Sequence, residues 1–573
     1  MRKLVLLLPV CLGLSLTQMA SRAQDDHHTG EGLEPALLTK PATNAWPTYA
    51  GDYSQKRFSP LTQINQTDVK NLALQWISAL PFGQRGGGSP FAERQVPTIV
   101  GGAVAKAVPV GGFGNRISGS ILQVNGILYL SAPDNAWAMD ARTGTVLWHY
   151  FWKTKGGTHI GNRGMAMYGD WLYFETPDDY LISLDAQTGK ERWHKPIADF
   201  DEQYFSTPAP IVVGNHVLVG TGDDLDAPGF LQSFDPVTGD RQWTFYTVPM
   251  EKGAPGLSTW KSLDAAQHGG GQVWIPGSYD PETHLYIFPT GNPTPAYTTA
   301  TRGDGANLYT CSIIAVDVDT GKMAWYYQTS PNDTHDWDST QSPVMVDGAF
   351  NGKPRKMVMQ AARNGYFFVL DRTNGQHLLT SRFSVTANWA KGVAPNGSLI
   401  RNPEKDATFA GSLVSPDNGG ATNWYPPTYD PQTGFFYLMS RENYSMYYLI
   451  ESDLRLIAGL GGKEEDGVGS FGAALLAINY KNGTIAWKYS FPAASSAGPS
   501  PAAVAGLLST AGHLLFSTDT EGDLVAFDPA NGKPLWHVQL GEVTNAPETY
   551  LLDGRQYILV ASGQSIAAFA LNQ

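Results

Sequence analysis

The sequence predicts an all-β protein, an eight-bladed β-propeller whose blades carry tryptophan tags. The main observation is a phrase that recurs along the chain, Asp-x-x-Thr/Asn-Gly, followed four residues later by Trp. A second observation is the composition: the 573 residues include 62 Gly, 38 Pro and 12% aromatic residues, whereas only 16% are charged. This composition is typical of many short strands joined by tight turns and argues against disorder or a coiled coil.

The recurring phrase has a clear role in a strand-turn-strand unit. Each copy follows an alternating apolar run, so the Asp and Thr/Asn can form the turn and the Gly can take a positive φ angle. The Trp can then begin the next strand and face a core between blades, which makes these tryptophans scaffold residues. The copies, one with Leu for Trp and one with Asn for Asp, are DARTGTVLW (140–148), DAQTGKERW (185–193), DPVTGDRQW (235–243), DVDTGKMAW (317–325), DRTNGQHLL (371–379), NYKNGTIAW (479–487) and DPANGKPLW (528–536).

The spacing of the tags predicts the number of blades. Successive Trp-equivalent positions lie 45, 50, 82, 54, 108 and 49 residues apart. A base period near 50 matches one four-stranded blade, with insertions in the long gaps. LALQW (72–76) predicts a further outer strand that closes the ring against the C-terminal blade, which gives eight blades. DPQTG (430–434) could mark a ninth blade, but we favour one enlarged blade.

The N-terminus predicts export. Arg2 and Lys3 precede the apolar run LVLLLPVCLGLSL, and SRA at 21–23 offers small residues for cleavage, so we expect a signal peptide over 1–23. The run is too short to span a bilayer comfortably, and no later stretch is long and apolar enough. The remaining 24–573 is expected to be a single propeller domain of a soluble periplasmic protein.

Charge and cysteine content exclude several classes. Removing 1–23 takes away three basic residues and no acid, so the net charge moves from −13 to −16. An acidic chain is a poor nucleic-acid binder, because phosphate contacts need clustered Lys and Arg. Such a charge could suit a basic protein partner. Cys311 is the only cysteine after the predicted signal, so we expect neither an intrachain disulfide nor a CxxCH haem attachment.

Two segments depart from the repeat, and several polar motifs accompany it. The inserted loops lie at about 81–116 and 442–469, and loops of this length usually cover a site or are mobile. NDTHDWDSTQ (332–341) concentrates three aspartates, and a plain surface turn would explain it equally well in isolation. It occurs together with three other polar motifs in the repeats, GTGDDLDAPGF (220–230), GGGQVW (269–274) and PTGNPTPAY (289–297). Their co-occurrence favours a site where loops of several blades converge.

With these motifs the sequence resembles the quinoprotein alcohol dehydrogenases, the pyrroloquinoline quinone (PQQ) propellers that include methanol dehydrogenase. The resemblance extends from WPTYAGDYSQKRFSPLTQIN (46–65) to the last tag. It implies PQQ, a Ca²⁺ ion, and an alcohol or polyol as substrate. It also implies site residues: Asp338 as catalytic base; Asp224 (or Asp223), Asn292 and Asp338 as metal ligands; and Trp274, Arg163, Arg363, Thr207, Thr221 and Asn423 as cofactor contacts.

The chemistry is consistent with these residue types. Ca²⁺ prefers several oxygen ligands at ~2.3–2.6 Å, which two carboxylates, an amide and the cofactor's oxygens can supply. As a Lewis acid the metal polarises the quinone carbonyl, and Asp338 can take the hydroxyl proton of the alcohol. Trp274 offers a flat floor for the quinone, and the two arginines match carboxylate or quinone oxygens. Asp333 and Asp336 are expected to form turns, and His335 to make a structural hydrogen bond.

The sequence also departs from the family pattern. Gly157-Thr158 stands where many relatives have two adjacent cysteines above the quinone, and Ser118 stands near a family glutamate. A family tryptophan is replaced around Val504. Asp224 is one methylene shorter than the usual Glu. Thr340 replaces the extra aspartate of lanthanide-using relatives, which favours Ca²⁺.

Three functions remain open at this stage. The first is a PQQ-dependent dehydrogenase that passes electrons to a separate cytochrome c, because the sequence has no CxxCH. The second is a non-catalytic propeller of the outer-membrane assembly type, which needs no axial acids. The third is a hydrolase or lyase that uses Asp338 with His335 and no quinone. We favour the first, because Asp224, Asn292, Asp338 and Trp274 occur together.

Overall fold

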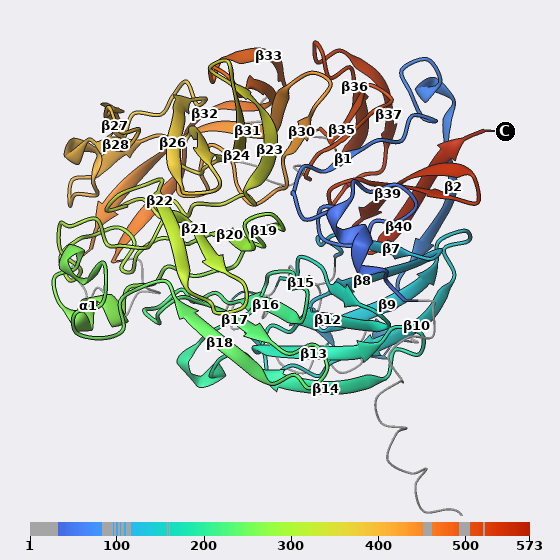
Figure 1. Cartoon of the computed structure of the whole chain (residues 1–573), viewed down its shortest axis with the longest axis horizontal. Coiled ribbons are helices and arrows are strands. Elements are labelled where there is room, and N and C mark those ends of the chain that lie inside the picture. Colours follow the sequence, from blue (N-terminus) through green and yellow to red (C-terminus); the bar gives the residue numbers. More distant parts are fainter. Residues whose placement is uncertain are drawn as a thin grey trace, which may run out of the picture.

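The strands of the chain form a closed ring of sheets (Figure 1). The structure, a computed structural model, describes residues 32–82, 116–157, 159, 161–450, 461–491, 505–519 and 522–572, and four two-residue strands between 95 and 109. Within these residues, eight sheets of four or five strands follow one another around the ring. The predicted all-β, eight-bladed propeller is therefore confirmed. The predicted signal peptide, 1–23, lies outside the described residues.

The blades are built from consecutive antiparallel strands, to which two N-terminal strands, one parallel and one antiparallel to its neighbour, are added in the last two blades. Blade 1 comprises β7 (Leu122–Val124), β8 (Ile127–Ala132), β9 (Asn135–Asp140) and β10 (Val146–Phe151), and blade 2 comprises β11 (Ala166–Tyr168), β12 (Trp171–Glu175), β13 (Tyr180–Asp185) and β14 (Glu191–Pro196). Blade 3 comprises β15 (Ile211–Val213), β16 (His216–Gly220), β17 (Phe230–Phe234) and β18 (Arg241–Tyr246), and blade 4 comprises β19 (Ser278–Asp280), β20 (Leu285–Pro289), β21 (Ser312–Asp317) and β22 (Met323–Gln328).

The second half of the ring repeats the pattern with additions. Blade 5 comprises β23 (Val344–Phe350), β24 (Lys353–Ala361), β25 (Tyr366–Asp371) and β26 (Gln376–Arg382), and blade 6 comprises β29 (Ser412–Val414), β30 (Thr428–Asp430), β31 (Phe435–Leu449), β32 (Gly462–Asn479) and β33 (Ile485–Ser490). Blade 7 comprises β1 (Phe58–Ser59), β34 (Leu508–Thr510), β35 (Leu514–Thr518), β36 (Asp523–Phe527) and β37 (Pro534–Gln539), and blade 8 comprises β38 (Glu548–Leu552), β39 (Arg555–Ser562), β40 (Ser565–Leu571) and β2 (Leu72–Ala79).

Short elements complete the described chain. They are β3 (Gln95–Val96), β4 (Ile99–Val100), β5 (Ala103–Val104), β6 (Val108–Pro109), β27 (Ala390–Val393), β28 (Leu399–Arg401), the helix α1 (Leu263–Gln267) and 3₁₀ turns at Pro35–Thr39, Val69–Asn71, Phe200–Glu202, Leu257–Thr259 and Pro403–Lys405. No helix in the described part of the chain is long and apolar enough to cross a membrane.

The ring closes through the two ends of the chain. The N-terminal strand β2 pairs antiparallel with the C-terminal strand β40, from Leu72 opposite Leu571 to Ala79 opposite Ser565. The outer strand predicted at 72–76 is therefore correct. DPQTG (430–434) forms the turn between β30 and β31, which pair within blade 6, so the prediction of one enlarged blade is also correct.

The tags join neighbouring blades as predicted. The indole N–H of Trp148 donates to the carbonyl oxygen of Ala186 in the next blade at 2.9 Å, and its ring lies against Gly189. A partly buried indole that finds a carbonyl acceptor keeps its apolar contacts without an unsatisfied donor. The same N–H to carbonyl contact to the next blade recurs from Trp76 to Ala141, Trp193 to Val237, Trp243 to Val318, Trp325 to Arg372 and Trp487 to Pro529.

Replacing the tag glycine is expected to loosen this junction. Gly189 has a φ of +68°, and a Cβ there would lie 2.6 Å from the Trp148 ring. Gly214 has a similar φ of +56° but nothing within 4 Å of its Cβ position. Gly189→Ala should therefore lower the free energy of unfolding by about 1–3 kcal/mol more than Gly214→Ala, because only the first overpacks a core. Urea unfolding of both variants measures the difference, and equal losses would contradict the tag junction.

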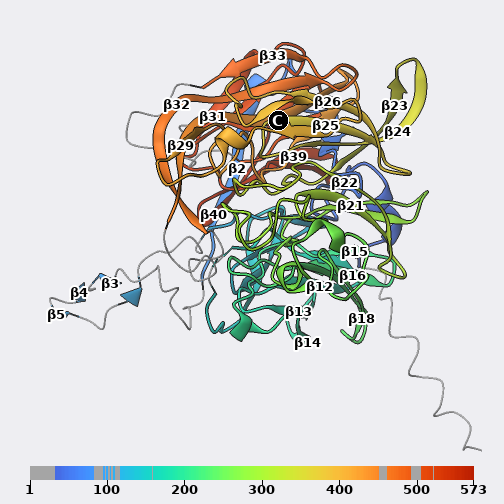
Figure 2. The ribbon, with the colours of Figure 1, turned by 90° about the vertical axis from the view of Figure 1, so that its left-hand side faces the viewer.

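The second inserted segment, 442–469, extends a blade. It contributes to the ends of β31 and β32, the long hairpin of blade 6, and β29 pairs with this extension (Figure 2). Tyr447 on β31 packs edge-on against Tyr297, with ring centroids 5.2 Å apart. Tyr297 follows Asn292 on the loop after β20, so this hairpin supports one of the loops that carry predicted site residues. Most of the first segment, 81–116, lies outside the described residues.

Candidate active site

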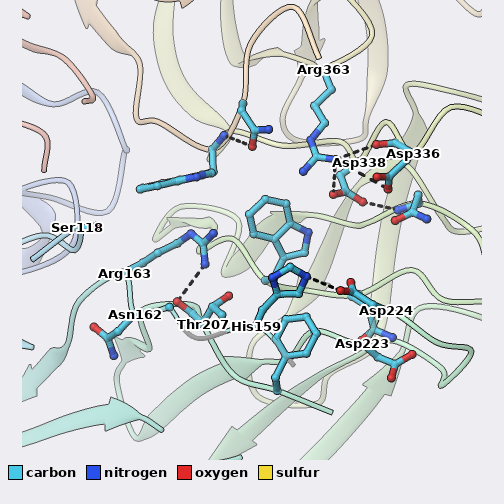
Figure 3. Close-up of a pocket in the computed structure, with 18 of the residues that line it drawn as sticks. Ser118, His159, Asn162, Arg163, Thr207, Asp223, Asp224, Asp336, Asp338 and Arg363 are labelled. Carbon is cyan, nitrogen blue, oxygen red and sulfur yellow. Dashed lines mark hydrogen bonds and ion pairs between the residues drawn. The ribbon is translucent and has the colours of Figure 1, made fainter. Parts of the chain in front are cut away.

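Loops from six blades converge on a cavity of about 570 Å³ (Figure 3). Eight of the nine predicted site residues line it, and Thr221 does not. Residues far apart in the sequence are thus brought to one place. The predicted site residues in the lining are Arg163, Thr207, Asp224, Trp274, Asn292, Asp338, Arg363 and Asn423.

Asp338, on the loop after β22, is held in a fixed orientation. Its Oδ1 accepts the backbone N–H of Asn292 at 2.6 Å, and its Oδ2 lies 3.1 Å from Nη1 of Arg363. Burial raises the pKa of the Asp338 carboxyl, while the positive charge of Arg363 and the backbone N–H act in the opposite direction. The carboxylate therefore faces the cavity with a paired cation at its side.

Arg363 joins two neighbouring carboxylate residues. Its Nη1 also donates to the backbone oxygen of Asp336 at 2.8 Å, and the Asp336 carboxylate lies 3.9 Å from the same nitrogen. Its Nε is buried and has no hydrogen-bond partner among the residues that the structure describes. Burial raises the pKa of Asp336 well above its usual value, and the charges of Asp338 and Asp224 raise it further. The negative charges of these carboxylates therefore repel one another, and the ionisation of one disfavours that of the others.

Asp223 and Asp224 follow β16 and have different environments. Asp224, whose side chain is 38% exposed, forms an ion pair with Nε2 of His159, and this contact raises the pKa of His159. Oδ1 of Asp223 accepts the N–H groups of Leu225 and Ala227, both at 2.9 Å, so Asp223 forms the turn. Of the two carboxylates, Asp224 therefore contacts a side chain that can carry a positive charge, His159, whereas Asp223 accepts backbone N–H groups.

An aromatic and cationic cluster occupies another part of the lining. The guanidinium of Arg163 lies 4.6 Å from the ring centroid of Trp274 and 4.7 Å from that of Trp424. Its Nη1 donates to the carbonyl oxygen of Thr207 at 3.1 Å. Burial lowers the pKa of Arg163 to about 10, so it remains protonated at neutral pH. A flat aromatic surface and a fixed cation therefore lie side by side.

Other predicted contacts differ in how they meet the cavity. Asn423 lines it, but its amide donates to Gly419 and accepts the N–H of Trp424. The hydroxyl of Thr221 is fully buried and lies 3.0 Å from Asp179 Oδ1 and 3.0 Å from the carbonyl oxygen of Phe205. Thr221 therefore sits behind the lining and supports it. Of the positions that depart from the family pattern, Ser118 lines the cavity, whereas Thr158 and Val504 lie outside the described residues.

Some lining residues were not predicted from the sequence. His159, Phe205, Trp424 and Asp336 line the cavity, although Asp336 was expected only to form a turn. His159, Phe205 and Trp424 lie outside the four polar motifs, although Trp424 directly follows the predicted Asn423. The other expectations for 332–341 agree with the structure. Asp333 accepts the N–H groups of His335 and Trp337, and His335 Nε2 contacts the carbonyl oxygen of Lys405 at 2.8 Å, away from the cavity lining.

The lining fits a planar, anionic cofactor with a hard metal ion. The buried Nε atoms of Arg163 and Arg363 and Oε1 of Gln272 have no hydrogen-bond partner within the described chain, although all three residues line the cavity. Buried polar atoms of this kind normally have partners, so the cavity offers unused donors and an acceptor beside Trp274. Among the residues that the structure describes, no group of three or more His, Cys, Asp or Glu side chains is arranged to hold a metal ion. A metal here would therefore need further oxygen ligands, such as a side-chain amide or oxygens of a cofactor.

Asp179, which contacts Thr221, predicts a pH dependence of stability. Burial raises the pKa of Asp179 to about 7, although hydroxyl groups of Ser206 and Thr221 lower it in part. Between pH ~4 and 7 the native protein keeps a proton that the unfolded chain has lost, so stability falls as pH rises through this range. One such group contributes at most about 1.4 kcal/mol per pH unit. Asp179→Asn should flatten the decline of the free energy of unfolding between pH 5 and 7, measured by urea titrations. Parallel curves for wild type and variant would contradict this assignment.

Comparison with known protein families adds independent findings. The family model described as "PQQ: Glucose/ethanol/alcohol dehydrogenase, beta-propeller domain" matches residues 46–383 and 470–558, which is more than half of the chain. The strands of all eight blades include matched residues, and the first matched segment contains all nine predicted site residues except Asn423.

Several characterised proteins are similar over nearly the whole chain. The quinohemoprotein alcohol dehydrogenase of Comamonas testosteroni is 34% identical, over 91% of this chain and 73% of that protein. The quinohemoprotein alcohol dehydrogenase ADH IIB of Pseudomonas putida is 32% identical over 97% and 78%. The 1-butanol dehydrogenase (cytochrome c) of Thauera butanivorans is 29% identical over 96% and 80%.

Solved structures share the same architecture. The crystal structure of the Comamonas testosteroni enzyme superposes with a TM-score of 0.79 at 28% identity, covering 94% of this chain and 82% of that one. A europium-containing methanol dehydrogenase superposes with a TM-score of 0.78 at 25% identity, covering 94% and 99%.

Proposed function

The chain belongs to the PQQ-dependent (quinoprotein) alcohol dehydrogenase family, and from this premise we propose that it oxidises an alcohol or polyol to the carbonyl compound. The observation that carries the proposal is the carboxylate of Asp338, which the backbone N–H of Asn292 and the guanidinium of Arg363 hold in the cavity that Trp274 also lines. A scaffold propeller has no need for such a set of buried charges. The non-catalytic alternative is therefore not favoured.

The chain's own residues can position the substrate and move its proton. Asp338 presents Oδ2 beside Arg363 and is the group to which we assign the role of general base, which takes the hydroxyl proton of the alcohol. Arg363 stabilises the ionised form of Asp338, which burial alone would disfavour. When bound, PQQ supplies a two-electron quinone that accepts the hydride, and the metal supplies Lewis-acid polarisation. Trp274 provides the aromatic surface, and Arg163 provides a cation for a cofactor carboxylate.

We assign the metal as Ca²⁺, held by carboxylate oxygens of Asp224 and Asp338 and the side-chain oxygen of Asn292. Nδ2 of Asn292 donates to the carbonyl oxygen of Pro293 at 3.0 Å, which leaves the amide oxygen as the atom available to a cation. Hard cations prefer such oxygen ligands. The buried Thr340, two positions after Asp338, offers a hydroxyl rather than a further carboxylate. The lower negative charge favours Ca²⁺ over a trivalent lanthanide.

We further propose an external electron acceptor and a periplasmic location. The 573 residues contain two cysteines, Cys11 and Cys311, and no CxxCH for covalent haem. The relative from Thauera butanivorans is named as cytochrome c-linked, and a separate cytochrome c is the acceptor that we propose here. The N-terminal apolar run after Arg2 and Lys3 supports export.

Reconstitution tests the proposed function. Purified protein is loaded with PQQ and Ca²⁺ and assayed for dye reduction with a panel of alcohols and polyols. We expect bound quinone absorbance and dye reduction that depends on PQQ, the metal and the alcohol together. Protein that is folded but neither binds PQQ nor reduces the dye would overturn the proposal. Release of a hydrolysis or elimination product without PQQ would favour the hydrolase or lyase alternative.

A further inference from the structure

Two loops that carry proposed metal ligands are joined side by side. Asn292 follows β20, and Asp338 follows β22, so both loops leave blade 4 at the same end. Near the cavity they are linked by the N–H of Asn292 to Asp338 at 2.6 Å and by the N–H of Ser339 to the carbonyl oxygen of Thr290 at 3.0 Å. Any change in the spacing of the loops would move two proposed metal ligands relative to each other.

A single arginine that does not line the cavity connects the same two loops. Arg302 is fully buried, and its Nε donates to the carbonyl oxygen of Pro295, three residues after Asn292, at 3.0 Å. Its Nη2 donates to the carbonyl oxygen of Asp333, five residues before Asp338. Its Nη1 donates to Oδ1 of Asn307, which holds the guanidinium in plane. One rigid cation therefore bridges both loops.

A buried arginine is a costly way to join two loops. Removing a guanidinium from water carries a penalty that is offset only by well-placed partners. The partners of Arg302 are chiefly backbone oxygens, and its planar fork fixes their directions as a flexible ammonium cannot. Burial lowers the pKa of Arg302 to about 10, so the side chain remains charged at neutral pH. The bridge is thus both strong and directional.

The neighbouring Asn332 reinforces the bridge. Its Nδ2 donates to the carbonyl oxygen of Gly303 at 3.1 Å and also to that of Gly305. Both glycines lie on the segment that contains Arg302. Arg401 in turn donates to the carbonyl oxygen of Asn332 at 2.9 Å. The segment 302–307 and the loop of Asp338 are therefore connected by a network that does not line the cavity.

We propose that Arg302 is a positioning residue of the metal site, which sets the spacing between Asn292 and Asp338 without touching the metal or the substrate. The inference rests on the proposed function, because it concerns the same metal. It predicts that Arg302→Lys, which keeps the charge but loses the planar fork, weakens metal binding more than its effect on stability explains. Groups that orient metal ligands typically contribute about 10–100-fold to affinity.

A second buried arginine provides a matched control. Arg57 is 1% exposed, and it donates to the carbonyl oxygens of Leu507, Tyr49 and Pro547. It also lies 3.8 Å from the Glu548 carboxylate, and none of these partners belongs to the two metal-ligand loops. Arg57→Lys should therefore destabilise the fold through the same loss of donors while leaving the spacing of Asn292 and Asp338 unchanged.

The experiment measures Ca²⁺ affinity and thermal stability together. Metal-free protein with PQQ is titrated with Ca²⁺ by calorimetry for the wild type, Arg302→Lys and Arg57→Lys. We expect at least a tenfold higher Kd for Arg302→Lys and a wild-type Kd for Arg57→Lys, with similar losses in Tm. Unchanged Ca²⁺ affinity in Arg302→Lys would overturn the inference alone. A wild type that binds no Ca²⁺ would overturn the inference and the proposed metal site together.

A milder variant covers the case in which Arg302→Lys does not fold. Asn332 has a φ of +50°, which glycine tolerates, so Asn332→Gly removes the amide donors without backbone strain. We expect a smaller loss of Ca²⁺ affinity in the same direction. A wild-type Kd for Asn332→Gly, with Arg302→Lys unfolded, would contradict a network that positions the metal ligands.

Discussion

Asp338→Asn is expected to lower kcat for alcohol oxidation by about 10²–10⁴-fold while the propeller stays folded. The amide keeps the shape of the carboxyl and an oxygen for the N–H of Asn292, but it cannot take a proton from the substrate. The loss should appear in kcat measured by dye reduction with saturating alcohol. Because Asp338 is also a proposed metal ligand, Tm, PQQ binding and Ca²⁺ binding are measured on the same preparations, and kcat is compared at saturating Ca²⁺, to separate a catalytic loss from unfolding or loss of cofactor or metal.

Asp336→Asn is the matched control for this variant. Asp336 lines the same cavity and lies near the same nitrogen of Arg363, at 3.9 Å instead of 3.1 Å for Asp338. Because the ion pair of its carboxylate with Arg363 is the longer of the two, we expect a loss of less than about tenfold in kcat. If the two variants lose kcat equally, the general base is not Asp338 alone. If Asp338→Asn retains wild-type kcat, the role assigned to Asp338 is wrong.

Asp224→Ala is expected to raise the Kd for Ca²⁺ by more than about 100-fold, because it removes a charged oxygen from a small ligand set. Treatment of the wild type with a chelator should abolish turnover, and added Ca²⁺ should restore it. In Asp224→Ala the restoration should need much higher Ca²⁺ or fail. The Ca²⁺ concentration at half-maximal turnover and calorimetry on the metal-free protein both measure the effect.

Two further variants make the assignment of Asp224 specific. His159→Ala removes the ion-pair partner of Asp224 but leaves the carboxylate, so Ca²⁺ affinity should be retained or increased. Asp223→Asn keeps an oxygen for the N–H groups of Leu225 and Ala227, and should leave Ca²⁺ affinity near that of wild type. A large loss in Asp223→Asn, with none in Asp224→Ala, would identify Asp223 as the ligand instead.

The fold was largely predictable from the sequence because its information is local and repeated. The turn of each tag needs a glycine at positive φ, such as Gly189 at +68°, and in most tags an indole one blade away covers that glycine. These requirements recur at a regular spacing, so the number of blades and the closing strand at 72–76 could be derived before any contact was known. DPQTG remained ambiguous, because only the pairing of β30 with β31 assigns that turn to blade 6.

The site was predictable only where a motif resembles a known family. Short motifs placed Trp274, Asn292 and Asp338, and the fold brings all three to one cavity. The same approach included Thr221, which lies behind the lining because its hydroxyl contacts Asp179 and the Phe205 carbonyl instead. It missed His159, whose partner Asp224 belongs to another blade.

The sequence by itself therefore determined the repeat, the closed ring and the residue types that converge at its loops. Backbone preferences of turns and the alternation of strands act over a few residues, so they can be read directly from the chain. The tertiary structure alone decided which side chains meet: His159 with Asp224, Arg163 with two indoles, and Arg302 with two loops. Those contacts join segments tens of residues apart or more, and their geometry depends on how whole blades pack.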